Sequence, residues 1–269
     1  MATIAITGGA GRIATAIAPL LRDAGHDLRL LDLVPPPAAV PADVVMIASA
    51  TDDAAVHRLA AGADLLLHLA AFPSERTWRK VVDTNIESTR VALDAARGEA
   101  VPVTVLASSV HAVGYLPAQE AGDRVPQPRP DTYYGVSKVV AEALGSLYAD
   151  RFGMRVVSIR IMNFDDRPRS VRALSAWVSP ADTARLVLAC LAAPPGHAIV
   201  WGVSANARRT VSLEAGRAMG YEPRDDAEAW ADGIAHDAGF ADAASVPPLA
   251  EPLGGTFTDP SRELGTDWA

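Results

Sequence analysis

A glycine-rich segment near the N-terminus, Thr7-Gly8-Gly9-Ala10-Gly11-Arg12-Ile13-Ala14, constrains the fold most strongly. It follows a short apolar run over residues 2–7 and precedes a helical pattern over residues 13–24. Glycines let the backbone turn tightly and approach a ligand closely, and the amides at a helix start carry partial positive charge. A strand, a glycine loop and a helix in this order predict a phosphate-binding turn at the edge of an α/β sheet.

The rest of the chain continues this alternation. Further strands are expected over residues 28–33, 43–47, 64–69, 101–107 and 154–161, and helices over residues 51–61, 76–97 and 131–152. A loop rich in proline and glycine covers residues 111–130. Strands that alternate with helices predict a Rossmann-type α/β fold, with a doubly wound parallel sheet covered on both faces.

The regularity weakens after residue 162, which predicts a Rossmann domain over residues 1–162 and a small substrate-binding part over residues 163–269. In this second part we expect a helix over residues 179–193, a strand over 197–201 and short helices over 212–219 and 227–234. The two parts are expected to pack as one compact unit.

Asp32 closes the second expected strand, 21 residues after Gly11. An acidic residue at about this distance accepts hydrogen bonds from both ribose hydroxyls of an adenosine, and it would repel a 2′-phosphate. Leu33 follows at a place where an NADP-binding protein carries an arginine. The pattern favours NAD, although an ordinary solvated aspartate at a strand end is the alternative.

Tyr134 and Lys138 lie four residues apart in the expected helix over residues 131–152, and hence on one face. Lys138 is one of only two lysines in a chain that otherwise uses arginine, the other being Lys80, for which the sequence gives no function. A neighbouring ammonium is expected to lower the pKa of a phenol, which can then take a hydroxyl proton while a hydride leaves to a nicotinamide. The alternative is a surface pair.

Ser108 and Ser109 follow the fifth expected strand, at its carboxyl end. Ligands of parallel α/β sheets bind at this edge. A serine hydroxyl there could polarise the reacting alcohol beside Tyr134.

The composition excludes several classes of function. The net charge of −8 argues against a nucleic-acid-binding surface, which needs a basic patch. Cys190 is the only cysteine, so neither an intrachain disulfide nor a cysteine-based metal site is expected. We see no apolar stretch that could span a membrane and no signal-peptide pattern, and we therefore expect a cytoplasmic protein. We also expect no metal site.

Together these residues resemble the extended, sugar-modifying branch of the short-chain dehydrogenase/reductase superfamily, the NAD-dependent epimerases and dehydratases. The motifs that match in order are the glycine loop, Asp32, His68-Leu69-Ala70-Ala71, Asn85, Ser109, Tyr134 and Lys138. The resemblance implies that Ser109, Tyr134 and Lys138 are catalytic. It also implies NAD contacts from Gly8, Ala10, Gly11, Arg12, Ile13, Asp32, Ser49, Leu69, Ala70, Ala71, Asn85, Tyr134, Lys138 and Ile161.

Within this branch the chain is most similar to enzymes that oxidise the anomeric carbon of a sugar acid, a uronate, with NAD to an aldarolactone. The resemblance then implies substrate contacts from Pro73, Ser109, Val110, His111, Tyr134, Asn163 and Arg172, of which Arg172 would hold the carboxylate. Arg172 could also belong to a solvated basic loop. Four positions depart from the pattern: Ser49 replaces an aspartate, Pro73 and Asn163 replace serines, and Val110 replaces an asparagine.

Two other functions remain open. A nucleotide-sugar epimerase or dehydratase, or another sugar ketoreductase, uses the same hydride step, but the roughly hundred residues after the sixth strand favour a small substrate. A protein that binds NAD without turnover is the second alternative, and such relatives often lack the tyrosine or the lysine. The resemblance also implies a homo-oligomer, a dimer or larger, built through helices 76–97 and 135–152.

Overall fold

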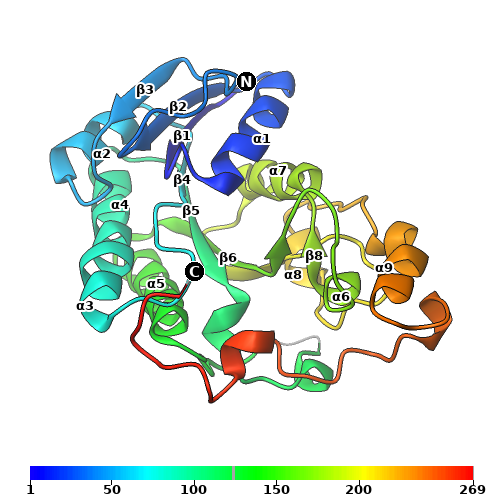
Figure 1. Cartoon of the computed structure of the whole chain (residues 1–269). Helices are drawn as coiled ribbons and strands as arrows, with labels where there is room; N and C mark the ends of the chain where they lie inside the picture. The colour runs from blue at the N-terminus through cyan, green and yellow to red at the C-terminus, as the bar shows by residue number, and fades with distance from the viewer. Residues whose placement is uncertain (123–124, 269) are drawn as a thin grey trace.

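The computed structural model describes residues 1–122 and 125–268, and its centre is a parallel sheet of seven strands (Figure 1). The strand order is β3-β2-β1-β4-β5-β6-β9, and every neighbouring pair is parallel. The strands are β1 (Thr3–Thr7), β2 (Asp27–Asp32), β3 (Val44–Ile47), β4 (Leu65–His68), β5 (Val103–Ser109), β6 (Arg155–Ile161) and β9 (Gly196–Gly202). The predicted doubly wound α/β sheet is confirmed.

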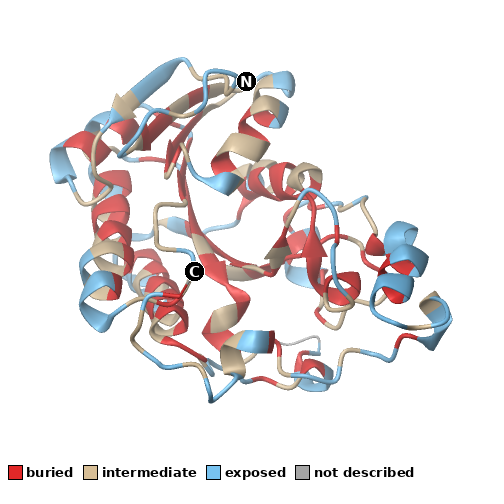
Figure 2. Cartoon of the chain, viewed as in Figure 1, coloured by how far each residue is buried: buried red, intermediate tan, exposed pale blue. Residues whose placement is uncertain are grey.

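Helices cover both faces of the sheet (Figure 1). On one face α1 (Arg12–Asp23) packs beside α7 (Pro180–Ala189), and on the other α2 (Asp53–Ala60), α4 (Glu87–Gly98) and α5 (Tyr133–Phe152) lie side by side. The central strands are therefore buried on both faces, as their continuous apolar sequence requires, whereas the edge strand β3 is largely exposed (Figure 2).

The strand order reverses between β1 and β4, which lie side by side although β2 and β3 separate them in the chain. Their carboxyl ends are Thr7 and His68, which are register partners. In open parallel sheets the crevice for a ligand lies outside the carboxyl ends at such a reversal. Strand β9 belongs to the C-terminal part, which thus completes the sheet and shares the largest apolar core with the N-terminal part.

The prediction of an uninterrupted helix over residues 76–97 is wrong for the first half of this range. The structure has α3 (Trp78–Lys80), a π-helical turn (Val81–Ile86) and then α4. Apolar periodicity does not distinguish a π turn from an α-helix over so few residues. The wider turn carries Asn85, whose buried side chain bonds to the neighbouring loop, and π turns of this kind often occur at functional sites.

The C-terminal part holds elements that the sequence did not predict. A two-stranded sheet joins β7 (Asn163–Phe164) to β8 (Trp177–Val178), and each strand is too short for a detectable alternation. The helix expected over 179–193 ends as α7 at Ala189 and continues as a 3-10 turn. The remaining short elements of this part are α6 (Ala173–Ala176), α8 (Glu214–Arg217) and α9 (Ala231–Asp237), with 3-10 turns at Cys190–Ala192, Ala227–Trp230, Ala243–Ser245 and Gly255–Thr258. Two further 3-10 turns, Val110–Val113 and Ala118–Glu120, lie after β5 in the N-terminal part.

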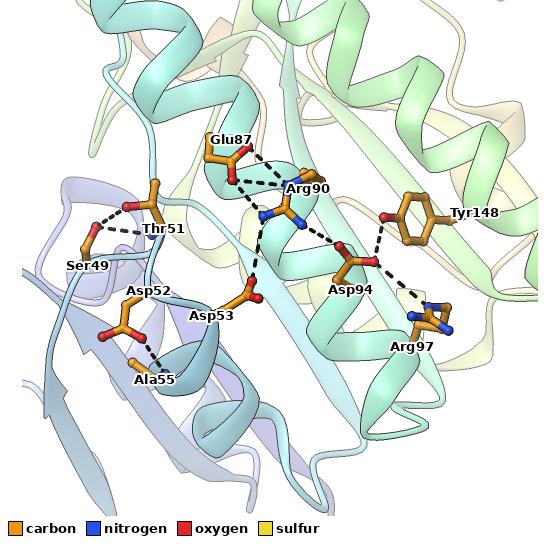
Figure 3. A network of polar contacts seen from close by, with 10 residues as sticks. All are labelled: Ser49, Thr51, Asp52, Asp53, Ala55, Glu87, Arg90, Asp94, Arg97 and Tyr148. Atoms are coloured by element: carbon orange, nitrogen blue, oxygen red, sulfur yellow. Dashed lines mark hydrogen bonds and ion pairs between the residues drawn. The ribbon is translucent and has the colours of Figure 1, made fainter.

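A polar network joins the outer faces of α2, α4 and α5 (Figure 3). Arg90 bonds to Glu87 and Asp94 on its own helix and lies 3.7 Å from Asp53 of α2. The Tyr148 hydroxyl of α5 donates to Asp94 at 2.7 Å. These contacts fix the spacing of α4 and α5, and thereby hold α5, which carries Tyr134, against the sheet.

Across the described ranges, no helix combines the length and the apolar character that crossing a membrane would require.

Candidate active site

The glycine loop forms a cradle between β1 and α1. Gly8 has φ +74°, and a Cβ at this position would lie 2.8 Å from the backbone nitrogen of Ala70. Helix α1 starts after Gly11, which is extended and offers no side-chain cap to the first amides of the helix. The backbone is thus bare and tightly turned, and it leads into the uncapped first amides of α1, which is the arrangement that a pyrophosphate requires.

Asp32 lies beside this loop, at the end of β2. Its two carboxylate oxygens accept hydrogen bonds from the amides of Ala10 and Leu33, at 2.9 and 2.7 Å. These bonds fix the carboxylate and leave further lone pairs for two ribose hydroxyls. A cavity of about 250 Å³ opens beside it. Its lining includes Gly8, Asp32, Ser49, Ala70, Ala71, Phe72 and Ser88, so several of the predicted cofactor residues meet there.

Four more of the predicted cofactor residues, Arg12, Ile13, Leu69 and Ile161, lie around the loop. Arg12 forms an ion pair with Asp165, and its side chain is 63% exposed. Ile13, Leu69 and Ile161 line a narrow apolar space beneath the loop. Ser49 bonds to Thr51 at 2.8 Å, before the start of α2. The structure therefore brings the predicted cofactor residues to one edge of the sheet, and their contact with a cofactor stays a prediction.

His68 is a buried link between β4, β1 and α4 rather than a titrating group. Nδ1 lies 2.8 Å from the hydroxyl of Thr7, and Nε2 faces the hydroxyls of Ser88 and Thr89. Burial, with a smaller contribution from the charge of Lys138, lowers the pKa of His68 to about 3. The ring thus stays neutral and ties together the strands at the reversal of the sheet.

Asn85 connects the π turn to α5. Its Oδ1 accepts from the amide of Phe72 at 2.8 Å, and its Nδ2 donates to the carbonyl of Phe72 and to Ser137 Oγ, both at 3.2 Å. The carboxamide is 2% exposed. The resemblance implied that Asn85 holds the cofactor or the geometry of the site. Its bonds to the loop after β4 and to α5 favour the second role, and a contact with NAD stays a prediction.

Tyr134 and Lys138 lie in the first turns of α5, which Thr132 caps by accepting from the amide of Gly135. The ammonium of Lys138 lies 5.5 Å from the centre of the Tyr134 ring and donates to the carbonyl of Ala107 at 2.7 Å. Both side chains are less than a tenth exposed. The helix thus places the phenol and the ammonium together beside the end of β5.

The expected lowering of the Tyr134 pKa is wrong for the ligand-free chain. Burial raises the pKa of Tyr134 to about 12, and a hydrogen bond with Ser109 only partly opposes that rise. Burial likewise lowers the pKa of Lys138 to about 8. The physical reason is that burial disfavours both charged forms, and the ammonium is directed at Ala107 rather than at the phenol oxygen.

The two serines at the end of β5 make different contacts. The hydroxyl of Ser109 accepts from the amide of His111 at 3.3 Å, and its interaction with the phenol lowers the pKa of Tyr134. Ser108 instead donates to Glu142, which forms a buried ion pair with Arg160. Ser109 is thus the serine beside the phenol, whereas Ser108 belongs to the packing between α5 and β6.

Arg172 is the most informative residue on the substrate side. Nη2 donates to the carbonyl of Leu253, while Nη1 is buried and has no hydrogen-bond partner among the residues that the structure describes. Burial lowers the pKa of Arg172, and the charges of Glu251 and Asp131 oppose that change. An orphaned donor on a buried cation costs about 1–3 kcal/mol, which an anionic ligand would recover.

His111 lies between Tyr134 and residues 253–268, which are called the C-terminal segment below. Its ring meets the Tyr134 ring edge-on at 5.6 Å and stacks on Phe257 at 4.0 Å. Phe257 follows Gly255, whose Cβ position would lie 3.0 Å from Nε of Arg172. The short segment over residues 253–257 thus joins the histidine to the arginine, which the sequence separates by 61 positions.

The other predicted substrate residues are placed less favourably. The side chain of Val110 packs in the large apolar core and is only 2% exposed, so we leave it out of the proposed substrate contacts. Pro73 is exposed in the loop after β4, and Asn163 is half-buried in β7. Their contact with a substrate stays a prediction.

Sequence reasoning missed two buried carboxylates. Glu75 is fully buried, and it accepts from the amides of Tyr134 and Gly265, both at 2.9 Å. Asp131 bonds to His111 at 2.6 Å. Glu75 thus holds the C-terminal segment against the start of α5. No periodic signal marks either residue, because each precedes a helix in the sequence, where acidic residues are common.

The C-terminal segment also explains the second lysine. Lys80 forms an ion pair with Asp267, next to Trp268, whose amide donates to the carbonyl of Glu75 at 3.1 Å. Both charged side chains are about half exposed, so the pair itself adds little stability. Lys80 thus helps to hold the C-terminal segment.

Within the described ranges, no cluster of three or more histidine, cysteine, aspartate or glutamate side chains is arranged to hold a metal ion.

Comparison with known proteins gives a consistent result. The family model described as the NAD dependent epimerase/dehydratase family matches residues 4–165. A uronate dehydrogenase from Pseudomonas putida is 36% identical over 227 residues, which cover 83% of this chain and 84% of that protein. An NAD-dependent glucose-6-phosphate dehydrogenase from Haloferax volcanii is 36% identical over 248 residues, covering 83% of this chain and 93% of that protein.

Solved structures agree. A mutant uronate dehydrogenase from Agrobacterium tumefaciens, complexed with NAD, superposes with a TM-score of 0.85 at 32% identity. The superposition covers 96% of this chain and 97% of the other. The likeness therefore includes the C-terminal part as well as the sheet.

Proposed function

This chain belongs to the NAD-dependent epimerase/dehydratase family, and we propose that it is an NAD-dependent dehydrogenase that oxidises a uronate at its anomeric carbon to the aldarolactone. The observation that carries the proposal is the buried Arg172 with its orphaned Nη1, which the segment over residues 253–257 and His111 link to Tyr134. The similar enzymes named uronate dehydrogenase, which extend over most of this chain, support it.

The residues at the sheet edge fit a dinucleotide. The bare backbone at Gly8 gives close approach to a pyrophosphate, and the fixed carboxylate of Asp32 suits a ribose without a 2′-phosphate. When bound, NAD supplies the acceptor for the hydride that leaves the anomeric carbon. Lys138 lies at the same edge and is suited to hold ribose hydroxyls, as the resemblance implies.

The protein residues carry the proton. Tyr134 takes the proton of the anomeric hydroxyl as the carbon–hydrogen bond gives up its hydride, so the carbon–oxygen bond becomes the lactone carbonyl. Ser109, whose interaction with the phenol lowers the pKa of Tyr134, orients the same hydroxyl. Because burial raises the Tyr134 pKa to about 12, the phenol needs positive charge close to its oxygen before it acts as a base at neutral pH.

Purified protein, NAD and a panel of sugars test the proposal directly. We expect growing absorbance of reduced nicotinamide with galacturonate or glucuronate and NAD, and a much weaker signal with NADP. The panel also contains glucose 6-phosphate, the substrate named for one relative, and a UDP-sugar for the epimerase alternative. Turnover of a UDP-sugar alone, or of no uronate, would overturn the proposal.

Replacing Arg172 with methionine is expected to separate the carboxylate contact from the rest of the site. Galacturonate and L-arabinose have the same ring configuration and differ by the carboxylate, so they form a matched pair of substrates. Losing a charged hydrogen bond of about 1.5–3 kcal/mol should lower kcat/KM for galacturonate by roughly 10- to 100-fold and leave that for L-arabinose nearly unchanged. Equal losses for both sugars would show that Arg172 only packs.

A homo-oligomer and a cytoplasmic location complete the proposal. Leu147 and Phe152 expose apolar surface on α5, the helix that the resemblance places at a dimer interface, and this supports the oligomer.

A further inference from the structure

We propose that Asp131 is a positioning residue of the substrate site, which acts by orienting His111. This inference rests on the proposed function, in which His111 contacts the sugar. Asp131 matches none of the motifs in the sequence, and it touches neither the reacting atoms nor the expected cofactor edge. Its importance follows from what surrounds its carboxylate.

The carboxylate of Asp131 occupies a space built for it. Its side chain is completely buried, and Oδ1 accepts from the hydroxyl of Thr132 at 2.9 Å. Glycines from separate segments make the room: a Cβ on Gly114 or Gly254 would lie 1.8 or 2.2 Å from Oδ2, and one on Gly135 would lie 3.0 Å from Oδ1. A larger residue at any of these positions would push the carboxylate aside.

The second oxygen of this carboxylate fixes the imidazole. Oδ2 lies 2.6 Å from Nδ1 of His111, and a carboxylate can only accept, so the proton of the neutral ring stays on Nδ1. The ring is further held by its stack on Phe257 and its edge contact with Tyr134. Nε2, which has no hydrogen-bond partner among the described residues, is then left as an acceptor for a sugar hydroxyl.

Burial makes this orientation firm. The His111 side chain is 14% exposed, so its bond to Asp131 is largely shielded from water. Without the carboxylate, the proton could move to Nε2 and the ring could turn over, and either change removes the acceptor. The charge of Asp131 also acts on two other groups without a hydrogen bond: it raises the pKa of Arg172 and that of Tyr134. A test must therefore separate the histidine from the arginine.

Nitrogen NMR of the histidine side chains in the intact wild-type protein tests the orientation without any variant and without turnover. We expect His111, assigned from the spectrum of His111→Gln, to be protonated at Nδ1 and unprotonated at Nε2. Asp131→Asn should shift this ring toward a mixture of tautomers. A wild-type His111 that carries its proton on Nε2 would overturn the proposal.

Kinetics of Asp131→Asn test the consequence. We expect kcat/KM for the uronate to fall about tenfold or more, with KM for NAD changed less than about twofold. Asp182→Asn is the matched control, since Asp182 lies in α7 and its side chain is as fully buried as that of Asp131. It accepts from the backbone amides of Arg224 and Asp225. This control should lower the melting temperature without changing kcat/KM. An Asp131→Asn enzyme that loses stability alone contradicts positioning.

A double-mutant cycle identifies the route. If Asp131 acts through His111, then Asp131→Asn should cost little in kcat/KM once His111→Gln is present. The same cycle with Arg172→Met should instead be close to additive. Additive losses with His111→Gln would overturn the proposal. Failure of the proposed function looks different, because the wild type would then turn over no uronate while the histidine tautomer still reports on Asp131.

Discussion

Phenylalanine in place of Tyr134 is expected to lower kcat by about 10²- to 10⁴-fold, because the substitution removes the hydroxyl that is proposed to take the substrate proton beside Ser109. The ring itself stays, so its edge contact with His111 and its burial at the start of α5 are kept. The melting temperature should therefore change by only a few degrees, and the dissociation constant for NAD should hardly change. Initial rates at saturating uronate measure kcat, and calorimetry measures the dissociation constant for NAD.

Tyr133→Phe is the matched control for this variant. Tyr133 is the preceding residue in α5, and its ring packs on Trp78 at 5.2 Å rather than on His111. This variant should keep full activity. If Tyr134→Phe retained more than about half of the wild-type kcat, another group would be the base, and the assignment of the proton step would be wrong.

Methionine in place of Lys138 is expected to abolish turnover and yet to stabilise the fold. The Lys138 ammonium is buried, and burial lowers its pKa to about 8 from 10.5. A shift of this size means that keeping the charge at pH 7 costs on the order of 3 kcal/mol. The variant avoids the cost of the buried charge but loses the hydrogen bond to the Ala107 carbonyl, which contributes about 1 kcal/mol. The free energy of unfolding should therefore rise by about 1–2 kcal/mol.

The pH dependence gives this prediction its sign. Between about pH 8 and 10.5 the unfolded chain binds more protons at Lys138 than the folded chain does. The wild type should therefore gain stability as the pH rises through this window, because the buried lysine becomes neutral. Urea unfolding at pH 7 and pH 10 should show the advantage of Lys138→Met shrinking as the wild type catches up. A constant advantage would contradict the burial argument.

Lys80→Met is the natural control, because Lys80 is the other lysine of the chain. Its side chain is 51% exposed and pairs with Asp267 on the surface, where such a pair contributes about 0–1 kcal/mol. Its loss should change the free energy of unfolding only slightly and leave kcat within about twofold. Lys138→Arg keeps the charge but puts a larger group into the buried site, and it should lose activity without gaining stability.

The cofactor edge was predictable because its residues are close in sequence or follow the ends of strands. The loop from Thr7 to Ala14, Asp32 and the stretch from His68 to Ala71 all meet where β1, β2 and β4 end. A parallel sheet brings the carboxyl ends of its strands to one edge whatever the loops between them do. Local patterns thus sufficed for the fold, for this edge and for the Tyr134–Lys138 face of α5.

The substrate side was less predictable. Arg172 and His111 were named only through a resemblance, and Val110, predicted beside them, is buried in the core instead. Glu75, Asp131 and Phe257 were not predicted at all, although they hold Tyr134, His111 and the C-terminal segment together. Their contacts join residues far apart in the chain and follow no periodic pattern.

The sequence by itself thus determined the α/β sheet, the glycine cradle and the pairing of Tyr134 with Lys138, because strand alternation and helical spacing are local properties of a chain. Only the tertiary structure decided the ionisation of that pair and the residues around the substrate. Burial sets the pKa of Tyr134 above its usual value and that of Lys138 below it, and burial depends on every segment packed around the two side chains.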